Sequence, residues 1–172
     1  MTMTDQKKGM MSEDQALQLV HSAIVKVLDG DDNIDAVFGS PVDTSLLPDY
    51  NTIIEYPRDL GTIAKSIEES LDGRGPYVTY GEALADVQLV WKNCLRYNDR
   101  PEDTEIVSLC HRGRSKFKEA LKDACAASGI RLADAPVRAL LDQPMRFSEE
   151  GKGDELPQKD IDDFEVVSAD SG

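Results

Sequence analysis

The sequence has few of the residues from which catalytic and metal sites are usually built. Among 172 residues there are two histidines, three cysteines and one tryptophan. His21 and His111 have no catalytic motif beside them, and the chain lacks a glycine-rich phosphate loop, a paired zinc-ligand spacing and a serine elbow. We therefore expect a protein that is not an enzyme and that uses no cofactor or metal ion.

The cysteines are an odd number, and Cys94, Cys110 and Cys125 lie far apart in the sequence. This arrangement fits neither a disulfide framework nor the short paired spacing of a zinc site. We expect reduced thiols on helical faces of an intracellular protein.

Long apolar runs and an excess of positive charge are also absent. No run approaches the roughly 20 apolar residues that a bilayer span needs, and no signal-peptide pattern follows the polar residues 1–11. The chain has 19 lysines and arginines against 33 acidic residues, a net charge of −14. Direct nucleic-acid binding needs clustered basic residues, so we expect basic partners, no nucleic acid and no membrane.

The length suits one domain with tails. We divide the chain into a flexible N-terminus at 1–11, a folded domain at 12–129, a segment at 130–142 that can form a short helix, and a tail at 143–172. The tail is rich in Glu, Asp, Gly, Ser and Pro and has few large apolar residues. This composition predicts an acidic, disordered end.

The first predicted helix is followed by a long loop. Ser12 and Gln15 have the spacing of a capping box, and apolar residues at steps of three and four follow them as far as Leu28. From Ile34 to Tyr56 this periodicity fails, although several apolar and aromatic side chains are present. Long loops that carry their own hydrophobic anchors are often binding elements.

Two further helices have clear start signals. Asp59 is placed as the N-cap of a second helix, which ends before the turn residues 72–76. Thr79 and Glu82 have the spacing of a second capping box. The third helix that they open keeps its apolar spacing through to Tyr97.

A fourth helix should begin at about Asp103 or Thr104 and run to Ala127, with Gly113 weakening it slightly from within. No strand pattern is found anywhere in the chain. Four helices, the first pair joined by a long loop, predict an all-α fold of the helix-bundle type.

Five ordered blocks between the first helix and the fourth resemble a known family. They are Phe38-x-x-Pro41-Val42-Asp43, Leu47-Pro48-Asp49-Tyr50, Ile54-x-x-Pro57-x-Asp59-Leu60-x-Thr62-Ile63, Tyr77, and Ala85-Asp86-Val87-x-Leu89-Val90-Trp91-x-Asn93-Cys94-x-x-Tyr97-Asn98. Together they strongly resemble a bromodomain, over roughly residues 16–127. The resemblance implies a left-handed four-helix bundle in which the loops after the first and third helices form a pocket for acetylated lysine.

This resemblance also implies a function. The chain would be a nuclear reader of acetylated histone tails or other acetylated proteins, acting in chromatin-linked transcription regulation. Its partners would be an acetylated histone tail peptide and other subunits of a chromatin complex. Acidic residues on or beside the two loops would make the pocket mouth negative and attract a basic tail.

Asn98 is the residue that the resemblance places on the acetyl group. Acetylation turns a charged ammonium into a neutral amide with one strong acceptor, which the NH2 of Asn98 can bind. Unmodified lysine would enter an apolar pocket as an unpaired charge, at a cost of several kcal/mol. Asparagine is also favoured at helix ends, so a C-cap is the alternative role, and the two roles are compatible.

The remaining site residues also come from the resemblance. Tyr50 would bind the acetyl group through an ordered water, Phe38 and Val42 would line its methyl end, Leu46 or Leu47 the loop-side wall, Tyr97 the base, and Ile106 the gatekeeper position opposite Val42. For each of these residues, an ordinary place in the core is the alternative.

Two departures from the family pattern matter. Arg58 stands where the family usually has Met, which should alter only a surface or helix-entry contact. Ala36-Val37 replaces the frequent Trp-Pro before Phe38, which removes an aromatic wall. The alternative function is therefore a bromodomain-like interaction scaffold with weak or no acetyl-lysine binding, although the presence of both Tyr50 and Asn98 speaks against it.

Overall fold

The computed structural model of the protein describes residues 12–129, so the predictions for 1–11, 130–142 and 143–172 lie outside the described residues. The described part contains helices and no strand. Its elements are α2 (Glu13–Gly30), α3 (Asp32–Phe38), α4 (Tyr50–Ile53), α5 (Leu60–Leu71), α6 (Tyr80–Tyr97), the short 3-10 helix η1 (Pro101–Asp103) and α7 (Thr104–Ala127). The four long helices are α2, α5, α6 and α7, which confirms the predicted all-α bundle.

The long helices begin where the capping signals predicted. At the start of α2, the Ser12 hydroxyl accepts from the Gln15 N–H at 3.1 Å, and the Gln15 side chain accepts from the Ser12 N–H at 3.0 Å. Thr79 forms the equivalent capping box at α6. The Asp59 carboxylate accepts from the Thr62 N–H at 2.8 Å and caps α5. These starts are predictable because cap and capped groups are neighbours in sequence.

The prediction of an unbroken loop from Ile34 to Tyr56 is wrong in two places, because the chain forms α3 and α4 within or across this stretch. Asp31 starts α3, since its carboxylate accepts from the N–H groups of Asn33 and Ile34 at 3.1 and 3.2 Å. Ile34 and Phe38, one turn apart, both face the core. A seven-residue helix with two buried side chains gives too short a stripe to recognise without its tertiary partners.

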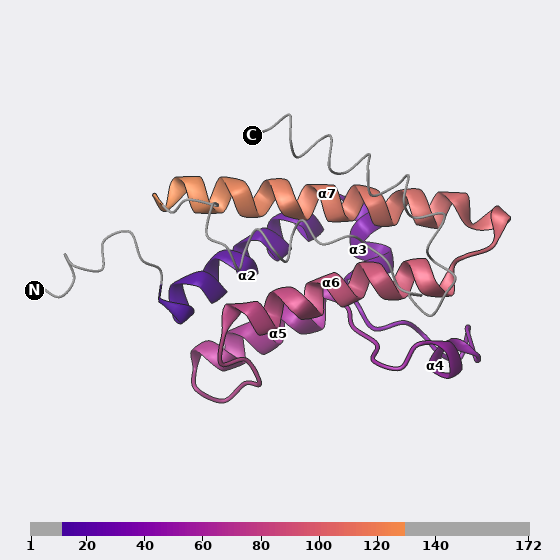
Figure 1. Cartoon of the computed structure of the whole chain (residues 1–172), viewed down its shortest axis with the longest axis horizontal. Coiled ribbons are helices and arrows are strands. Elements are labelled where there is room, and N and C mark those ends of the chain that lie inside the picture. Colours follow the sequence, from indigo (N-terminus) through magenta and orange to yellow (C-terminus); the bar gives the residue numbers. More distant parts are fainter. Residues whose placement is uncertain (1–11, 130–172) are drawn as a thin grey trace, which may run out of the picture.

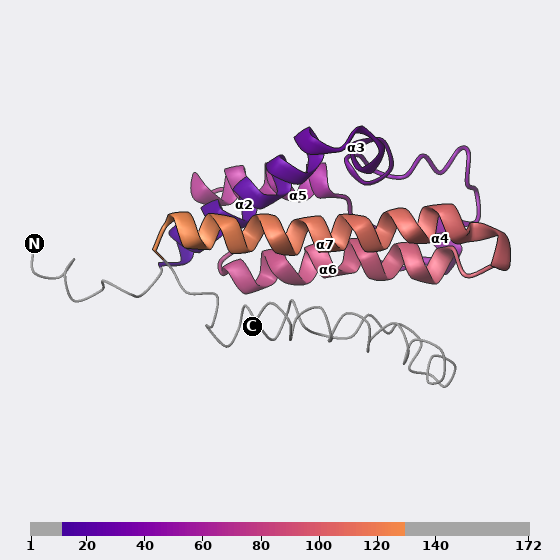
Figure 2. The same cartoon turned by 90° about the horizontal axis from the view of Figure 1, so that it is seen from above.

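The core lies between the four long helices. In Figures 1 and 2, α2 and α7 lie side by side, α6 follows α7 along its length, and α5 covers the other side of α2. The largest fully buried side chains come from all four long helices and from α3, with one, Ile54, just after α4. They include Leu17, Ile24, Ile34, Ile54, Leu60, Ile63, Ile67, Leu84, Trp91, Arg114 and Phe117.

Trp91 occupies the centre of this core and explains a glycine in α7. Its ring lies edge-on to Phe38, with centroids 5.3 Å apart and an interplanar angle of 73°. A Cβ atom added at Gly113 would lie 3.0 Å from the Trp91 ring. The sequence suggested only that Gly113 weakens its helix, whereas the structure shows that its missing side chain makes room for the indole.

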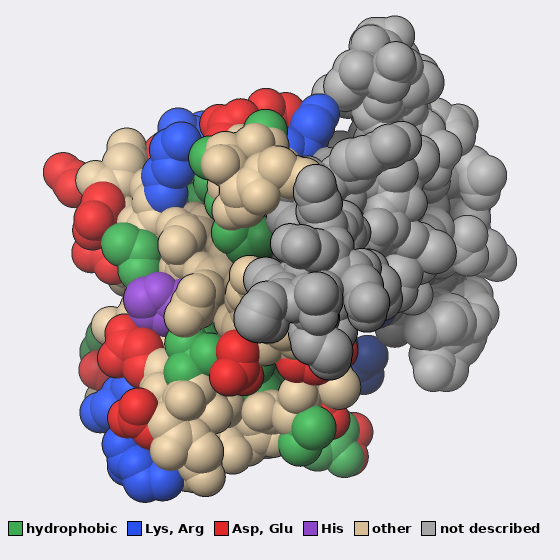
Figure 3. Space-filling view, turned by 90° about the vertical axis from the view of Figure 1, so that its left-hand side faces the viewer, with side chains coloured by type: hydrophobic (Ala, Val, Ile, Leu, Met, Phe, Trp, Pro, Cys, Tyr) green, Lys and Arg blue, Asp and Glu red, His purple; other side chains and the backbone are tan. Residues whose placement is uncertain are grey.

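Both connections implicated in the predicted pocket lie at one end of the bundle. Figure 1 shows α4 and the bend between α6 and α7 together at the right-hand end. The turn between α5 and α6, where Gly73 has a φ of +82°, lies at the other end with the start of α2. Seen from that end, the described side chains mix acidic, basic and hydrophobic groups (Figure 3). Of the helices within residues 12–129, none combines the length and the low charge that a membrane span requires.

Candidate functional site

Asn98 is the C-cap of α6, and two of its donors hold the same carbonyl. Its backbone N–H and its side-chain Nδ2 both donate to the Cys94 carbonyl oxygen at 2.9 Å. An asparagine NH2 carries two hydrogens, and only one is needed for this bond. The second hydrogen faces the Cys94 Sγ, 3.6 Å from Nδ2, which is a weak acceptor that a ligand carbonyl can replace. The cap role and the predicted ligand role are therefore compatible in one side chain.

Tyr50, the first residue of α4, lies beside the end of α6. Its side chain is only 6% exposed, and its ring centroid is 4.9 Å from that of Tyr97. Burial, with smaller effects of Cys94 and Tyr97, raises the pKa of Tyr50 to about 12. The hydroxyl therefore stays protonated at physiological pH and can both donate and accept a hydrogen bond.

The Tyr97 hydroxyl fastens the long connection to α6. It donates to the Asp49 carboxylate at 2.6 Å, across 48 positions of sequence. The hydrogen bond to this carboxylate, helped by partial burial, raises the pKa of Tyr97. Tyr50 thus packs on Tyr97 at the end of α6, where Asn98 follows in the chain, and the roles of the three residues toward acetyl-lysine stay predictions.

Two polar contacts that sequence reasoning missed shape the connections on either side. The buried Asn93 side chain donates to the Tyr56 carbonyl oxygen at 2.8 Å, which ties the end of the long connection to α6. Between α6 and α7, the Arg100 guanidinium donates to both oxygens of Asp103 at 2.9 and 3.0 Å. A polar Asn93 in the middle of an apolar helical stripe was the available signal for the first contact.

The predicted apolar wall is only partly assembled around these groups. Val42 and Ile106 are half-buried, and Ile106 packs against the core. Phe38 is 5% exposed and belongs to the core itself, where it contacts Trp91. Leu47 is 37% exposed and Leu46 is 74% exposed. The roles assigned to these five apolar side chains in the pocket stay predictions.

Comparison with known proteins decides the family. The bromodomain family model matches residues 22–112, more than half of the chain. The chain belongs to the bromodomain family. A Drosophila melanogaster "Bromodomain-containing protein homolog" is 31% identical over 141 residues, which is 76% of this chain and 9% of that protein. "Transcription factor GTE1" of Arabidopsis thaliana is 44% identical over 73 residues, 41% of this chain and 18% of that protein.

Solved structures agree with this assignment. The second bromodomain of Candida albicans Bdf1, solved bound to an imidazopyridine, matches with a TM-score of 0.52 and 31% identity. The match covers 60% of this chain and 94% of that one. The bromodomain thus accounts for nearly all of the matched structure, whereas the chain spans only a small part of the curated relatives above.

Arg58, one of the two departures from the bromodomain pattern, makes a specific contact. Its Nε lies 3.1 Å from a carboxylate oxygen of Asp86 on α6, and its NH1 donates to the Pro57 carbonyl oxygen at 2.8 Å. The second oxygen of Asp86 accepts from the Tyr77 hydroxyl at 2.7 Å. The arginine thus joins the residues just before α5 to α6. Ala36 and Val37, the other departure, are exposed on α3.

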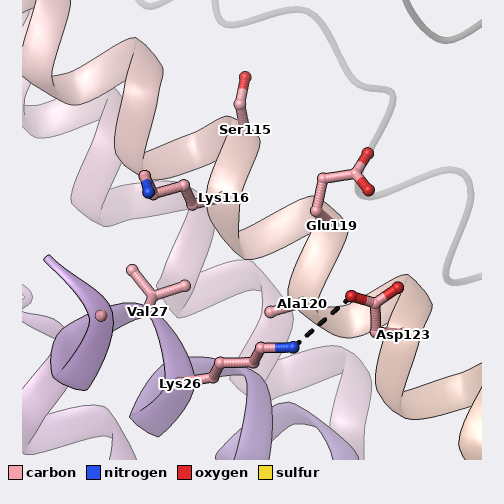
Figure 4. A pocket seen from close by; sticks show the side chains of 8 residues that line it. Lys26, Val27, Ser115, Lys116, Glu119, Ala120 and Asp123 are labelled. Carbon is pink, nitrogen blue, oxygen red and sulfur yellow. Dashed lines mark ion pairs between the residues drawn. The ribbon is translucent and has the colours of Figure 1, made fainter.

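The bromodomain also has a groove of about 360 Å³ between α2 and α7. Val27 and Ala120 form its apolar floor, and Lys26 and Asp123 close one side with an ion pair of 3.6 Å (Figure 4). It shares no residue with the predicted acetyl-lysine site. Within residues 12–129, no group of His, Cys, Asp or Glu is arranged to hold a metal ion.

Proposed function

We propose that this bromodomain is a non-catalytic acetyl-lysine reader that binds acetylated histone tails in the nucleus. The observation that carries the proposal is the position of Asn98 and Tyr50 at the same end of α6, where Tyr50 packs on Tyr97. Asn98 donates twice to the Cys94 carbonyl, and its second amide hydrogen meets only the weak sulfur acceptor of Cys94, while Tyr50 is buried with a protonated hydroxyl. One direct donor and one hydroxyl at the end of an apolar bundle suit a neutral amide.

Recognition follows from the chemistry of the two lysine forms. The acetyl oxygen accepts from Asn98 directly and from Tyr50 through a water, which is enthalpically close to a direct bond. An unmodified ammonium group would find no carboxylate in the predicted wall of Val42 and Ile106 and would lose its hydration. Rejection of the charged form, rather than the single hydrogen bond, provides most of the selectivity.

The charge around this end of the bundle supports a basic peptide as the ligand. Asp49, Glu55, Asp99, Glu102 and Glu105 are exposed on or beside the two connections. A negative rim attracts a lysine- and arginine-rich tail and speeds its encounter more than it strengthens the final complex. The relative named as a transcription factor supports a role in transcription, with other subunits of a chromatin complex as further partners.

An NMR titration tests the proposal. Acetylated histone peptides should shift signals of residues in the α2–α5 and α6–α7 connections, and the same peptides without acetylation should not. The Asn98→Ala variant should lose the response, because the buried acetyl oxygen then lacks its donor, at a cost of about 1–3 kcal/mol or roughly five- to 150-fold in Kd. Its fold should persist because the backbone N–H of residue 98 still reaches the Cys94 carbonyl.

Asn51→Ala is the matched control, since Asn51 is an exposed asparagine on α4. This variant should bind like the wild type. If an array of acetylated peptides gives no binding to the wild type, the acetyl-lysine proposal is wrong and an interaction scaffold built on the same bundle replaces it.

A further inference from the structure

Cys94 lies directly beneath the proposed acetyl-lysine site. It is one turn before Asn98 on α6, and its Sγ is 3.6 Å from the Asn98 Nδ2. It also lies close enough to Tyr50 to affect that hydroxyl. Cys94 is a buried residue of the core, with 7% of its surface still exposed.

A second thiol approaches Cys94 from the neighbouring helix. Cys110 on α7 is fully buried, and its Sγ donates to the Trp91 carbonyl oxygen at 3.5 Å. Helix carbonyls point toward the C-terminus, so this oxygen faces the turn that contains Cys94. Cys110 therefore lies against the turn of α6 that carries Cys94, whereas Cys125 lies farther along α7, near Leu84 and Leu121.

We propose that Cys94 and Cys110 form a peroxide-sensitive dithiol that controls the pocket, with Cys94 as the reacting thiol and Cys110 as the resolving one. Both residues are buried, but Cys94, at the site, is 7% exposed, whereas Cys110 behind it has no exposed surface. A two-step oxidation requires this arrangement, because the reacting sulfur must contact the oxidant, whereas the resolving sulfur needs to contact only the reacting one.

The chemistry balances with hydrogen peroxide as the oxidant. The Cys94 thiolate attacks one peroxide oxygen, the O–O bond breaks, and hydroxide leaves, which gives a sulfenic acid on Cys94. The Cys110 sulfur then attacks the Cys94 sulfur, the S–O bond breaks, and water leaves as the S–S bond forms. Overall, two thiols lose two electrons and two protons, and one peroxide becomes two waters.

The surroundings of the two sulfurs shift their thiol pKa values in opposite directions. Hydrogen bonds from Cys110 and Asn98 lower the pKa of the Cys94 thiol, against the opposing effect of its burial. Burial raises the pKa of Cys110, so this sulfur keeps its proton at first and gives it to the oxygen leaving Cys94 when it attacks in the second step. A thiolate rather than a thiol is the nucleophile toward peroxide, which favours Cys94 as the first to react.

Disulfide formation would disturb the ligand site, and this part of the inference rests on the proposed function. The S–S bond length of about 2.05 Å draws the Cys94 sulfur toward α7. This movement takes it away from the Asn98 amide and shifts the turn whose carbonyl holds Asn98. Loss of alignment at one hydrogen bond should weaken binding of an acetylated peptide by roughly two- to tenfold.

Peroxide treatment of the full chain, followed by mass spectrometry, tests the dithiol. The wild type should lose two hydrogens, and peptide mapping should show a bond between Cys94 and Cys110. The Cys110→Ala variant should instead stop at one added oxygen on Cys94, and Cys125→Ser should behave like the wild type. Equal oxidation of the three thiols, or a bond that includes Cys125, would overturn the proposal.

The effect on binding is measured separately with an acetylated peptide. Peroxide should raise the Kd of the wild type, and dithiothreitol should restore it, whereas neither treatment should change the Kd of Cys110→Ala by as much. A disulfide that leaves the Kd unchanged would overturn control of the pocket. If the reduced wild type binds no acetylated peptide, the proposed function fails, and the mass measurement still decides the dithiol.

Discussion

Replacement of Gly113 by alanine sets two effects of known size against each other. Alanine is favoured over glycine inside a helix by about 0.5–1 kcal/mol. The new methyl group, however, would lie 3.0 and 3.2 Å from two atoms of the Trp91 ring and 3.7 Å from Ile34. Trp91 is fully buried and lies against Phe38, so the indole has no free space into which to move.

Overpacking of a rigid core costs about 1–3 kcal/mol, so the clash should outweigh the gain in helix propensity. We expect Gly113→Ala to lower the free energy of unfolding by about 1 kcal/mol. Urea unfolding followed by far-UV circular dichroism gives this value, because the signal of the helices does not depend on the environment of Trp91.

Gly81→Ala is the matched control on α6. A Cβ atom at this position meets only the Thr79 hydroxyl, at 3.8 Å. The helix propensity gain is unopposed there, so the variant should be more stable than the wild type by up to about 1 kcal/mol. A Gly113→Ala variant as stable as Gly81→Ala would refute the packing argument.

Three further predictions concern single contacts. The Arg112 guanidinium donates to Asp31 and holds the pKa of that carboxyl below its ordinary value of about 3.9. The contact therefore stabilises the fold above this pH, and its contribution is lost as the pH falls through the lowered value. In acid titrations followed by circular dichroism, the difference in stability between Arg112→Gln and the wild type should be present at neutral pH and should vanish in strong acid. Tyr97→Phe removes the hydrogen bond to Asp49, so hydrogen exchange of the backbone amides in α4 should accelerate by roughly two- to tenfold. Unchanged exchange would show that this bond does not stabilise the segment. Thr79→Ala removes the N-cap of α6 and should cost about 1 kcal/mol in urea unfolding, with a cost near zero counting against the cap.

The sequence alone was sufficient to predict those features whose interacting residues are close together in the chain. Ser12, Asp59 and Thr79 cap the N–H groups of residues three positions later, so their helices could be placed to within a residue. The family blocks located Asn98 and Tyr50 at one end of a bundle, and the structure brings both to the end of α6. Local spacing carries this information because helix geometry repeats with every turn.

Contacts between residues that are far apart in the sequence could be known only from the tertiary structure. The ion pair between Asp31 and Arg112 spans 81 positions of the sequence. Asp31 is also the N-cap of α3, a helix too short to be predicted from its own sequence. The fit of Trp91 over Gly113 and the approach of Cys110 to the turn of Cys94 likewise depend on how α6 packs on α7. Sequence spacing specifies which face of a helix is apolar, but not which residues of another helix that face will meet, because that choice is made by the packing of the whole core.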